Sequence, residues 1–303
     1  MKHLLSLGDL TTEEIYNIID LGDELKRKQK AGIEHKYLNG KSVALIFQKS
    51  STRTRTSFEV GVYQLGGYGT FLNANDMQIA RGEPIEDTAR VLSRYFDGIM
   101  IRTFEQKQVE DLAKYGSIPI INGLTDYCHP CQVLADLMTI REYKGKLDGL
   151  KMCYIGDGNN MANSLIVGGL KAGMNVTAVC PDNYRPDKKV LDFAKDFKGF
   201  ELCSKPEDGA VDADVLVTDV WTSMGQEQER LERMEAFAGY QINEKLMELA
   251  KPDAMVQHCL PAHRGEEITA DVFEAHANEI FDEAENRLHA QKAVMSILLG
   301  KME

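Results

Sequence analysis

The sequence predicts an α/β protein with two domains, each a parallel sheet flanked by helices. Short apolar segments alternate with longer amphipathic ones along the whole length, which is the pattern of parallel strands connected by helices. A polar, glycine-bearing stretch at residues 144–149 interrupts this alternation, and 303 residues suffice for two buried cores. We therefore expect domains at residues 1–143 and 144–284, followed by a C-terminal helix at 285–303 that packs back on the first domain.

The composition excludes several classes of protein. Hydrophobic residues make up 43% of the chain and charged residues 27%, as in ordinary globular proteins. A formal net charge of -12 disfavours nucleic-acid binding, because no basic face is available for phosphates. The six cysteines lack the spacing of a disulfide scaffold, and no apolar segment approaches the roughly 18 residues that span a membrane. We expect a cytoplasmic protein with reduced thiols and neither a membrane nor a nucleic-acid partner.

Short apolar runs mark the expected strands. In the first domain they follow a helix that begins at a capping box in residues 11–14. The expected strands are residues 43–47, 70–72, 98–101 and 118–121 in the first domain, and 152–155, 176–179, 215–217 and 255–258 in the second. The last helical segment has one apolar face, formed by Ala290, Ala293, Val294, Ile297 and Leu298.

Most polar motifs of the chain lie directly after an expected strand. These motifs are residues 51–55, Arg102, residues 126–132, residues 156–160, Asp219 onward and residues 258–261. In open parallel sheets, ligands bind beyond the carboxyl ends of the strands. The turns that follow the strands are therefore the expected functional positions.

The first of these turns, residues 51–55, reads Ser-Thr-Arg-Thr-Arg and opens a helix. Unpaired backbone N–H groups at a helix N-terminus, together with hydroxyl and guanidinium groups, favour a phosphate-sized anion. Arg102 follows strand 98–101 and adds a third cation to Arg53 and Arg55. The alternative is a Ser/Thr cap followed by solvated arginines.

His129-Pro130-Cys131-Gln132 begins a further helix, with proline in a tolerated first-turn position. An imidazole held there can donate a hydrogen bond to a carbonyl and polarise it, whereas a lone histidine at a helix start often serves as a cap. Cys128 and Cys131 also form a CxxC pair, which in isolation indicates a redox pair or half of a metal site. We disfavour that interpretation, because the sequence contains no second CxxC.

Two turns of the second domain carry groups suited to an amino acid. Residues 156–160 read Gly-Asp-Gly-Asn-Asn, but Met161 replaces the third glycine of a dinucleotide loop. The adjacent asparagine amides can instead bind the amine and carboxylate of a zwitterion. Asp219, close in sequence to the only tryptophan and to Ser223, suits an ammonium group. The alternatives are an NAD-binding oxidoreductase for the first turn and a helix cap for the second.

His258-Cys259-Leu260-Pro261 closes the last expected strand. Its thiol is a core residue, a contact to the substrate, or a metal ligand together with His258 and His263. Zinc is disfavoured, because no carboxylate or second thiol has a spacing that completes a tetrahedral set. We expect neither a metal nor a cofactor.

These segments together resemble the ornithine branch of the aspartate/ornithine carbamoyltransferase family. The resemblance covers essentially the whole chain, and the Ser-Met-Gly and His-Cys-Leu-Pro segments carry the ornithine-specific part. Cys131 stands where the family commonly has threonine, while the flanking His129 and Gln132 are retained. The matching segments are residues 51–55, Arg102, His129-Pro130-x-Gln132, Asp219 with Ser223-Met224-Gly225, residues 258–261 and the Glu-Ala-Glu-Asn-Arg of residues 283–287.

The resemblance implies a role for each matching residue. Carbamoyl phosphate would be bound by Ser51, Thr52, Arg53, Thr54, Arg102, His129, Pro130, Cys131, Gln132, Cys259, Leu260 and Arg287. Ornithine would be bound by Asn160, Asp219, Ser223 and Met224. The catalytic residues would be Arg102, His129, Asp219 and Cys259. Gln78 would reach the site of a neighbouring subunit, which implies a homo-oligomer, most simply a trimer.

The implied reaction transfers the carbamoyl group to the δ-amine of L-ornithine and gives citrulline and phosphate. Amine attack forms a tetrahedral oxyanion, so the site needs cations and a carbonyl donor but no covalent nucleophile. The amine must be neutral, which costs roughly 4–5 kcal/mol at pH 7, and Asp219 with Cys259 would assist its deprotonation. The alternatives are a carbamoyltransferase for another amine, such as putrescine or an acylated ornithine, and a catalytically silent carbamoyl-phosphate-binding protein.

Overall fold

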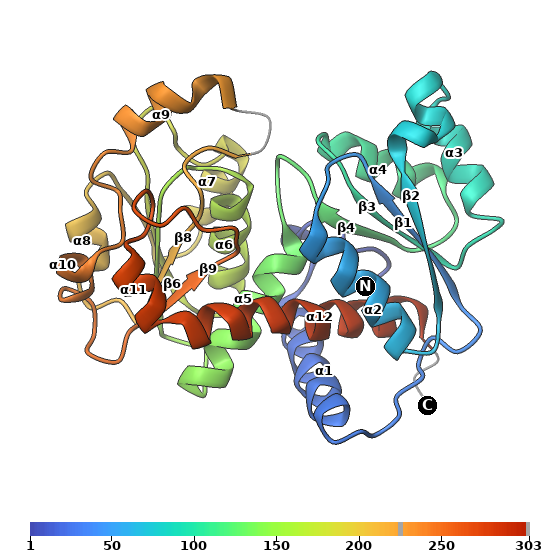
Figure 1. The fold of residues 1–303 in the computed structure, drawn as a ribbon, viewed down its shortest axis with the longest axis horizontal. Coiled ribbons are helices and arrows are strands. Elements are labelled where there is room, and N and C mark those ends of the chain that lie inside the picture. Colours follow the sequence, from blue (N-terminus) through green and yellow to red (C-terminus); the bar gives the residue numbers. More distant parts are fainter. Residues whose placement is uncertain (224–226, 301–303) are drawn as a thin grey trace. The chain divides into compact units, whose positions relative to one another are not determined.

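The computed structural model describes residues 1–223 and 227–300 (Figure 1). The chain divides into two compact units, which we call unit 1 (Met1–Met138 with Glu285–Glu303) and unit 2 (Thr139–Ala284). Each unit is built on its own parallel sheet flanked by helices. The predicted fold class is therefore confirmed.

Unit 1 contains a four-stranded parallel sheet with the order β2-β1-β3-β4. Its strands are β1 (Ser42–Phe47), β2 (Tyr68–Asn73), β3 (Gly98–Arg102) and β4 (Ile120–Leu124). The central strands β1 and β3 are almost wholly buried, which explains their continuous apolar runs. β4 begins later than the predicted 118–121 and includes Asn122 and Gly123, which interrupt the apolar pattern but are buried in the sheet.

Helices connect these strands and cover the sheet (Figure 1). The predicted capping box is present, because Thr11 Oγ1 accepts from the Glu14 N–H at 3.1 Å and Glu14 Oε2 accepts from the Thr11 N–H at 2.9 Å. The helices of this part of the chain are η1 (Leu7–Asp9), α1 (Thr12–Lys30), α2 (Thr52–Gln64), η2 (Ala74–Asp76), η3 (Gln78–Arg81), α3 (Ile85–Leu92) and α4 (Gln106–Tyr115).

Unit 2 contains a five-stranded parallel sheet with the order β7-β6-β5-β8-β9. Its strands are β5 (Lys151–Ile155), β6 (Asn175–Val179), β7 (Phe200–Cys203), β8 (Val215–Thr218) and β9 (Met255–His258). The edge strand β7 was not predicted from the sequence, because it is short and only partly buried and therefore lacks a clear apolar run. The other strands match the predicted segments closely.

The core of unit 2 lies between its central strands and the helices that follow them. Ile155, Leu216 and Val256, from β5, β8 and β9, pack in one cluster with Phe273 and Ile280. The helices within this unit are α6 (Asn160–Lys171), α7 (Lys188–Ala194), α8 (Pro206–Ala210), η4 (Glu227–Glu229), α9 (Arg230–Ala236), α10 (Glu244–Met247) and α11 (Ala270–Ala275).

Two helices carry the chain from one unit to the other. The chain leaves unit 1 within α5 (Pro130–Lys144), between Met138 and Thr139, and it returns within α12 (Ala277–Leu299), between Ala284 and Glu285. The later part of α12 packs against unit 1, where Leu299 contacts Gly98 of β3 so closely that a Cβ atom on this glycine would clash. The prediction of a C-terminal helix that packs back on the first domain is thus confirmed.

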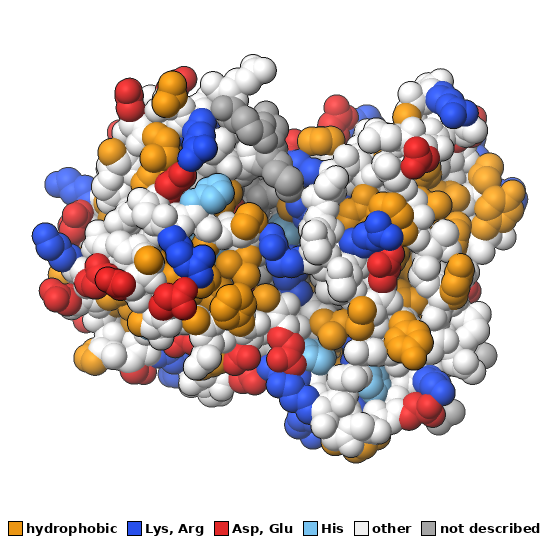
Figure 2. Space-filling view, in the orientation of Figure 1, with side chains coloured by type: hydrophobic (Ala, Val, Ile, Leu, Met, Phe, Trp, Pro, Cys, Tyr) orange, Lys and Arg blue, Asp and Glu red, His pale blue; other side chains and the backbone are white. Residues whose placement is uncertain are grey.

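The surface carries mixed charge. On the face of the described residues shown in Figure 2, Lys and Arg side chains are scattered among Asp and Glu side chains. Within the described part of the chain, no helix is long and apolar enough to cross a membrane.

Candidate active site

The predicted anion loop is the N-terminus of α2, directly after β1. Ser51 caps this helix, because its Oγ accepts from the backbone N–H of Thr54 at 3.1 Å. The helix dipole adds positive potential at this helix N-terminus, which favours an anion there. The chain thus forms the strand, cap and helix start that the sequence predicts.

Thr54 is the hydroxyl on which two arginines converge. Its Oγ1 accepts from Nη1 of Arg102 at 3.2 Å and from Nη2 of Arg287 at 2.7 Å. Arg102 ends β3 and Arg287 lies in α12, and all three side chains are buried in unit 1. Two guanidinium groups held this close beside a helix N-terminus favour the binding of an anion. We call Ser51, Thr54, Arg102 and Arg287 the anion cradle.

His129 lies beside the cradle and is a neutral imidazole. Burial lowers the pKa of His129 well below the usual 6.5, and the positive charges of Arg287, Arg102 and Lys49 lower it further. A neutral imidazole can donate a hydrogen bond to a carbonyl oxygen without carrying a charge of its own. This state suits the predicted role of polarising a carbamoyl group.

The rest of the His129 segment is tied into unit 1. Gln132 Nε2 donates to Asp136 Oδ1 at 2.8 Å, one turn further along α5. Cys131 Sγ donates to the backbone carbonyl of Asn122 at 3.4 Å, and burial raises the pKa of this thiol to about 12. Burial raises the pKa of Cys128 to about 12 as well. Two protonated thiols with such high pKa values do not form the reactive pair of a redox motif.

The other predicted residues of unit 1 divide into those that share the first turn of α2 with the cradle and those that do not. Arg55 is exposed, pairs with Glu59 at 3.1 Å and stacks on the ring of Phe71, so it does not join the cradle as a third cation. Thr52 and Arg53 occupy the first turn of α2 with the cradle residues. Gln78 begins η3 and is exposed.

Lys49 is a residue that the sequence analysis missed. It is buried, its Nζ pairs with Asp126 Oδ1 at 2.7 Å, and it lies over the ring of Phe104 at 4.9 Å. The pair joins the turn after β1 to the turn after β4, and Lys49 contributes to the low pKa of His129. The strand-end rule would have included Lys49, because it follows β1 before the Ser-Thr-Arg-Thr-Arg segment begins.

In unit 2, three strand-end turns lie side by side because β8 pairs with both β5 and β9. Thr218, the last residue of β8, is in register with Ile155 and with His258. Its hydroxyl donates to the backbone carbonyl of Ile155 at 2.7 Å and fixes the end of the sheet. The residues that follow these three strands therefore meet at one edge.

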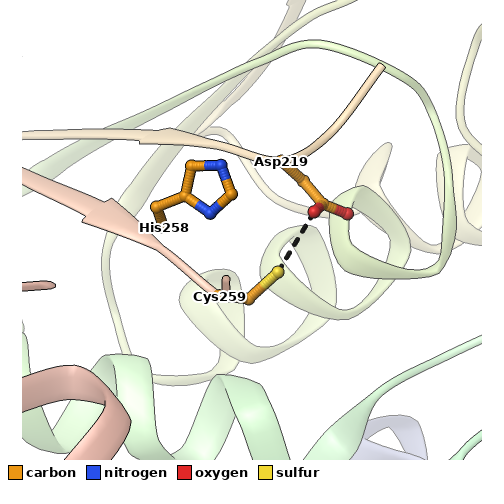
Figure 3. A group of neighbouring side chains, drawn as sticks. All are labelled: Asp219, His258 and Cys259. Atoms are coloured by element: carbon orange, nitrogen blue, oxygen red, sulfur yellow. Dashed lines mark hydrogen bonds between the residues drawn. The ribbon is translucent and has the colours of Figure 1, made fainter. Parts of the chain in front are cut away.

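Asp219 is the centre of this edge (Figure 3). Its Oδ1 accepts from Sγ of Cys259 at 3.1 Å and from the N–H of Val220 at 2.8 Å. Its Oδ2 accepts from Nδ2 of Asn159 at 2.9 Å. Asn159 also caps α6, and the predicted Asn160 is the next residue, the first of that helix. A carboxylate held by an amide and a thiol is suited to binding an ammonium group.

Figure 3 also shows the ring of His258. Two hydrogen bonds to residues not drawn there hold this ring in place. Nδ1 accepts from the N–H of Leu260 at 2.9 Å, so Nε2 carries the proton and donates to Oε1 of the buried Glu267 at 2.9 Å. Leu260 has a left-handed backbone with φ of 59°, which this bond supports. Asp219, His258 and Cys259 lie close enough together to hold a metal, but His258 would have to give up one of these bonds to bind it.

Ser223 and Met224, the remaining predicted residues of unit 2, follow Asp219 in the sequence. Ser223 is the last described residue before 224–226, and Met224 lies outside the described residues. Trp221 is buried and stacks on Phe237 with ring centroids 6.0 Å apart.

Comparisons with known proteins assign both units to one family. Residues 2–142 match the family model for the carbamoyl-P binding domain of aspartate/ornithine carbamoyltransferase, and residues 148–298 match the model for its Asp/Orn binding domain. The ornithine carbamoyltransferase of Thermococcus kodakarensis is 55% identical over 99% of this chain and 96% of its own length. That of Oceanobacillus iheyensis is 56% identical over 99% of this chain and 94% of its own length.

A solved structure shows the same fold. The ornithine carbamoyltransferase of Pyrococcus furiosus superposes with a TM-score of 0.94 at 52% identity, covering 100% of this chain and 98% of the other. The match extends over both units, and the family-model matches include the strand-end turns described above. This chain belongs to the aspartate/ornithine carbamoyltransferase family.

Proposed function

We propose that this protein transfers the carbamoyl group of carbamoyl phosphate to the δ-amine of L-ornithine, giving L-citrulline and phosphate. The observation that carries the proposal is the convergence of Arg102 and Arg287 on the Thr54 hydroxyl, beside a neutral His129. This is the chemistry needed for a phosphate that is attached to a polarised carbonyl. Relatives more than half identical to this chain are named ornithine carbamoyltransferases.

In unit 1, the cradle holds the phosphate, with Thr52 and Arg53 of the same helix turn contributing further donors. His129 donates to the carbonyl oxygen, which becomes an oxyanion when the amine attacks the carbon. Pro130, Cys131 and Gln132 continue the segment that faces the carbamoyl part. The arginines stabilise the charge that develops on phosphate as the C–O bond breaks, so the leaving group needs no proton from a buried acid.

In unit 2, Asp219 binds the amine of ornithine, and Asn160, Ser223 and Met224 contribute to amino-acid binding. Removing a proton from an amine with a pKa of about 10.4 costs roughly 4–5 kcal/mol at pH 7. The Asp219 carboxylate, which accepts from the Cys259 thiol at 3.1 Å, assists this proton loss together with Cys259. Cys259 and Leu260 complete the contacts to the amine and to the carbamoyl group.

The test is citrulline or carbamoyl-product formation from carbamoyl phosphate with four acceptors: L-ornithine, putrescine, N-acetylornithine and L-aspartate. A strong preference for ornithine supports the full proposal. Preference for another acceptor keeps the anion cradle but contradicts the role assigned to Asp219 and Ser223. Carbamoyl-phosphate binding without turnover on any acceptor would establish the silent binding protein instead.

The active form is proposed to be a cytoplasmic trimer in which Gln78 reaches a neighbouring site. Gln78 is exposed in η3, as such a role requires. The test mixes two variants, Gln78→Ala and Arg102→Ala, after reversible dissociation. If sites are shared, random trimers recover about a quarter of wild-type activity, because one site in four then combines both native residues. Independent sites would give no recovery above the average of the two separate variants.

A further inference from the structure

Arg233 is a buried arginine of unit 2 that the proposed chemistry does not use. It lies in α9, and only 3% of its surface is exposed. Its Nε donates to the backbone carbonyl of Trp221 at 2.6 Å, and its Nη2 donates to Oδ2 of Asp157 in a short contact. Asp157 lies in the turn after β5 and Trp221 in the turn after β8. One guanidinium group therefore joins two strand-end turns.

The two acceptors lie close in sequence to Asn160 and Asp219, two of the residues proposed to bind ornithine. Asp157 lies two positions before Asn159, and Trp221 lies two positions after Asp219. Asn159 and Asp219 are themselves joined by a hydrogen bond of 2.9 Å. Arg233 thus ties the two turns together at a second point, so neither turn can shift along the sheet edge without breaking one of its bonds.

Aromatic rings fix the plane of the guanidinium. The Arg233 Cζ lies 4.8 Å from the ring centroid of Tyr184 and 5.4 Å from that of Phe237. Phe237 in turn stacks on Trp221, whose carbonyl Arg233 contacts. A planar group packed against rings and bonded along two edges holds its acceptors in one geometry, which a lysine ammonium does not do.

Arg233 also changes the balance of charge at this sheet edge. Burial raises the pKa of Asp157 to about 6, while Arg233 lowers it and the nearby Asp219 raises it. Near neutral pH, Asp157 is therefore mostly ionised and close to the carboxylate of Asp219. Arg233 offsets the charge of Asp157 and also pairs through Nη1 with Glu229 at 3.5 Å, while Asp219, held by an amide and a thiol, is the strand-end carboxylate proposed to attract an ammonium group.

We propose that Arg233 is a positioning residue for ornithine: its contacts to Asp157 and Trp221 set the two turns that carry Asn160 and Asp219, which are assigned to the amino acid. The inference rests on the proposed function. It predicts a selective effect, because carbamoyl phosphate is assigned chiefly to the cradle, whose residues belong to unit 1, whereas both acceptors of Arg233 belong to unit 2.

The experiment compares steady-state kinetics of the wild type, Arg233→Met, Arg233→Lys and the control Arg230→Met. Arg230 lies on the same helix but is exposed. Its Nη2 pairs with Oε1 of Glu266 at a distance of 2.6 Å. Arg233→Met should raise the KM for ornithine by about tenfold or more, since two charged hydrogen bonds are lost, and leave the KM for carbamoyl phosphate within about twofold. Arg233→Lys should show an intermediate KM for ornithine, and the control should match the wild type.

Trp221 supplies an independent readout, because it is the only tryptophan of the chain. Its emission maximum should move to longer wavelength in Arg233→Met and stay unchanged in Arg230→Met. If Arg233→Met does not fold, Arg233→Lys decides by the same two KM ratios and the same emission spectrum.

The inference is overturned if a folded Arg233 variant binds ornithine like the wild type, or if both KM values rise in parallel. Its failure is distinguishable from failure of the proposed function. In the first case the wild type makes citrulline and the variant keeps the wild-type KM for ornithine. In the second case the wild type makes no citrulline, and the emission spectra alone report whether Arg233 sets the position of Trp221.

Discussion

Replacing Thr54 by valine tests the anion cradle directly. Valine keeps the shape of threonine but removes the oxygen that accepts from Arg102 at 3.2 Å and from Arg287 at 2.7 Å. All three residues are buried, so water does not readily replace the lost acceptor. A hydrogen bond to a charged group contributes about 1.5–3 kcal/mol, and two bonds that share an acceptor are not additive. We therefore expect the free energy of unfolding to fall by about 2–4 kcal/mol.

The assay is urea denaturation followed by far-UV circular dichroism, because the only tryptophan, Trp221, lies in unit 2 and does not report on unit 1. Thr56→Val is the matched control: Thr56 lies on the same helix but is exposed, and its effect should stay below about 0.5 kcal/mol. Inorganic phosphate should stabilise the wild type more than Thr54→Val and so widen the difference in free energy of unfolding, because Thr54 is itself assigned to the phosphate site. The reasoning would be refuted if Thr54→Val lowers the free energy of unfolding by less than about 1 kcal/mol, or if phosphate stabilises Thr54→Val and the wild type equally.

Three further predictions follow from the site and from its buried charges. Cys259→Ala should lower kcat by about a hundredfold and change the pH dependence of kcat. The control Cys203→Ala, on the edge strand β7, should change neither. An unchanged pH profile in Cys259→Ala would contradict a role of this thiol in proton transfer. The imidazole resonances of His129 should not titrate between pH 8 and pH 6.5 in NMR spectra, because burial and nearby cations lower its pKa well below 6.5; a midpoint in this window would show that the ring is charged near pH 7. Burial lowers the pKa of Lys292 from 10.5 to about 8, so the unfolded chain binds more protons between these values and stability should rise with pH across them. The rise attributable to this lysine is about 3 kcal/mol, and comparison with Lys292→Met in urea denaturation should isolate it.

The sequence predicts the location of candidate site residues well where that location follows from chain order. Parallel strands of apolar residues place their following turns at one edge of a sheet, so Arg102, Asp219 and Cys259 could be selected from their positions alone. The helix cap at Ser51 is also local, because the cap and the N–H that it accepts are three residues apart. Such features need no knowledge of tertiary packing.

Partners from distant parts of the chain are harder to predict. Arg287 reaches Thr54 across 233 positions of sequence, and only the family resemblance pointed to it. The Lys49–Asp126 pair spans 77 positions and carries no local pattern that distinguishes it from a surface ion pair. The same holds for Arg233, which in the sequence is one of several charges on a polar helical segment. In each case the partner is decided by which turns the sheet order brings together.

The two units differ in the chemistry that these long-range contacts create. In unit 1, arginines converge on a hydroxyl beside a helix N-terminus, and the pKa of His129 is lowered by burial first and then by their positive charge. In unit 2, Arg233 instead offsets the charge of Asp157. The carboxylate proposed to attract an ammonium group is then Asp219, which is held by an amide and a thiol. Under the proposed function, the sheet edge of unit 1 binds an anion and that of unit 2 binds an ammonium group, although the whole chain carries a net charge of -12. Local placement of a few buried arginines, rather than overall charge, determines which ligand each sheet edge favours.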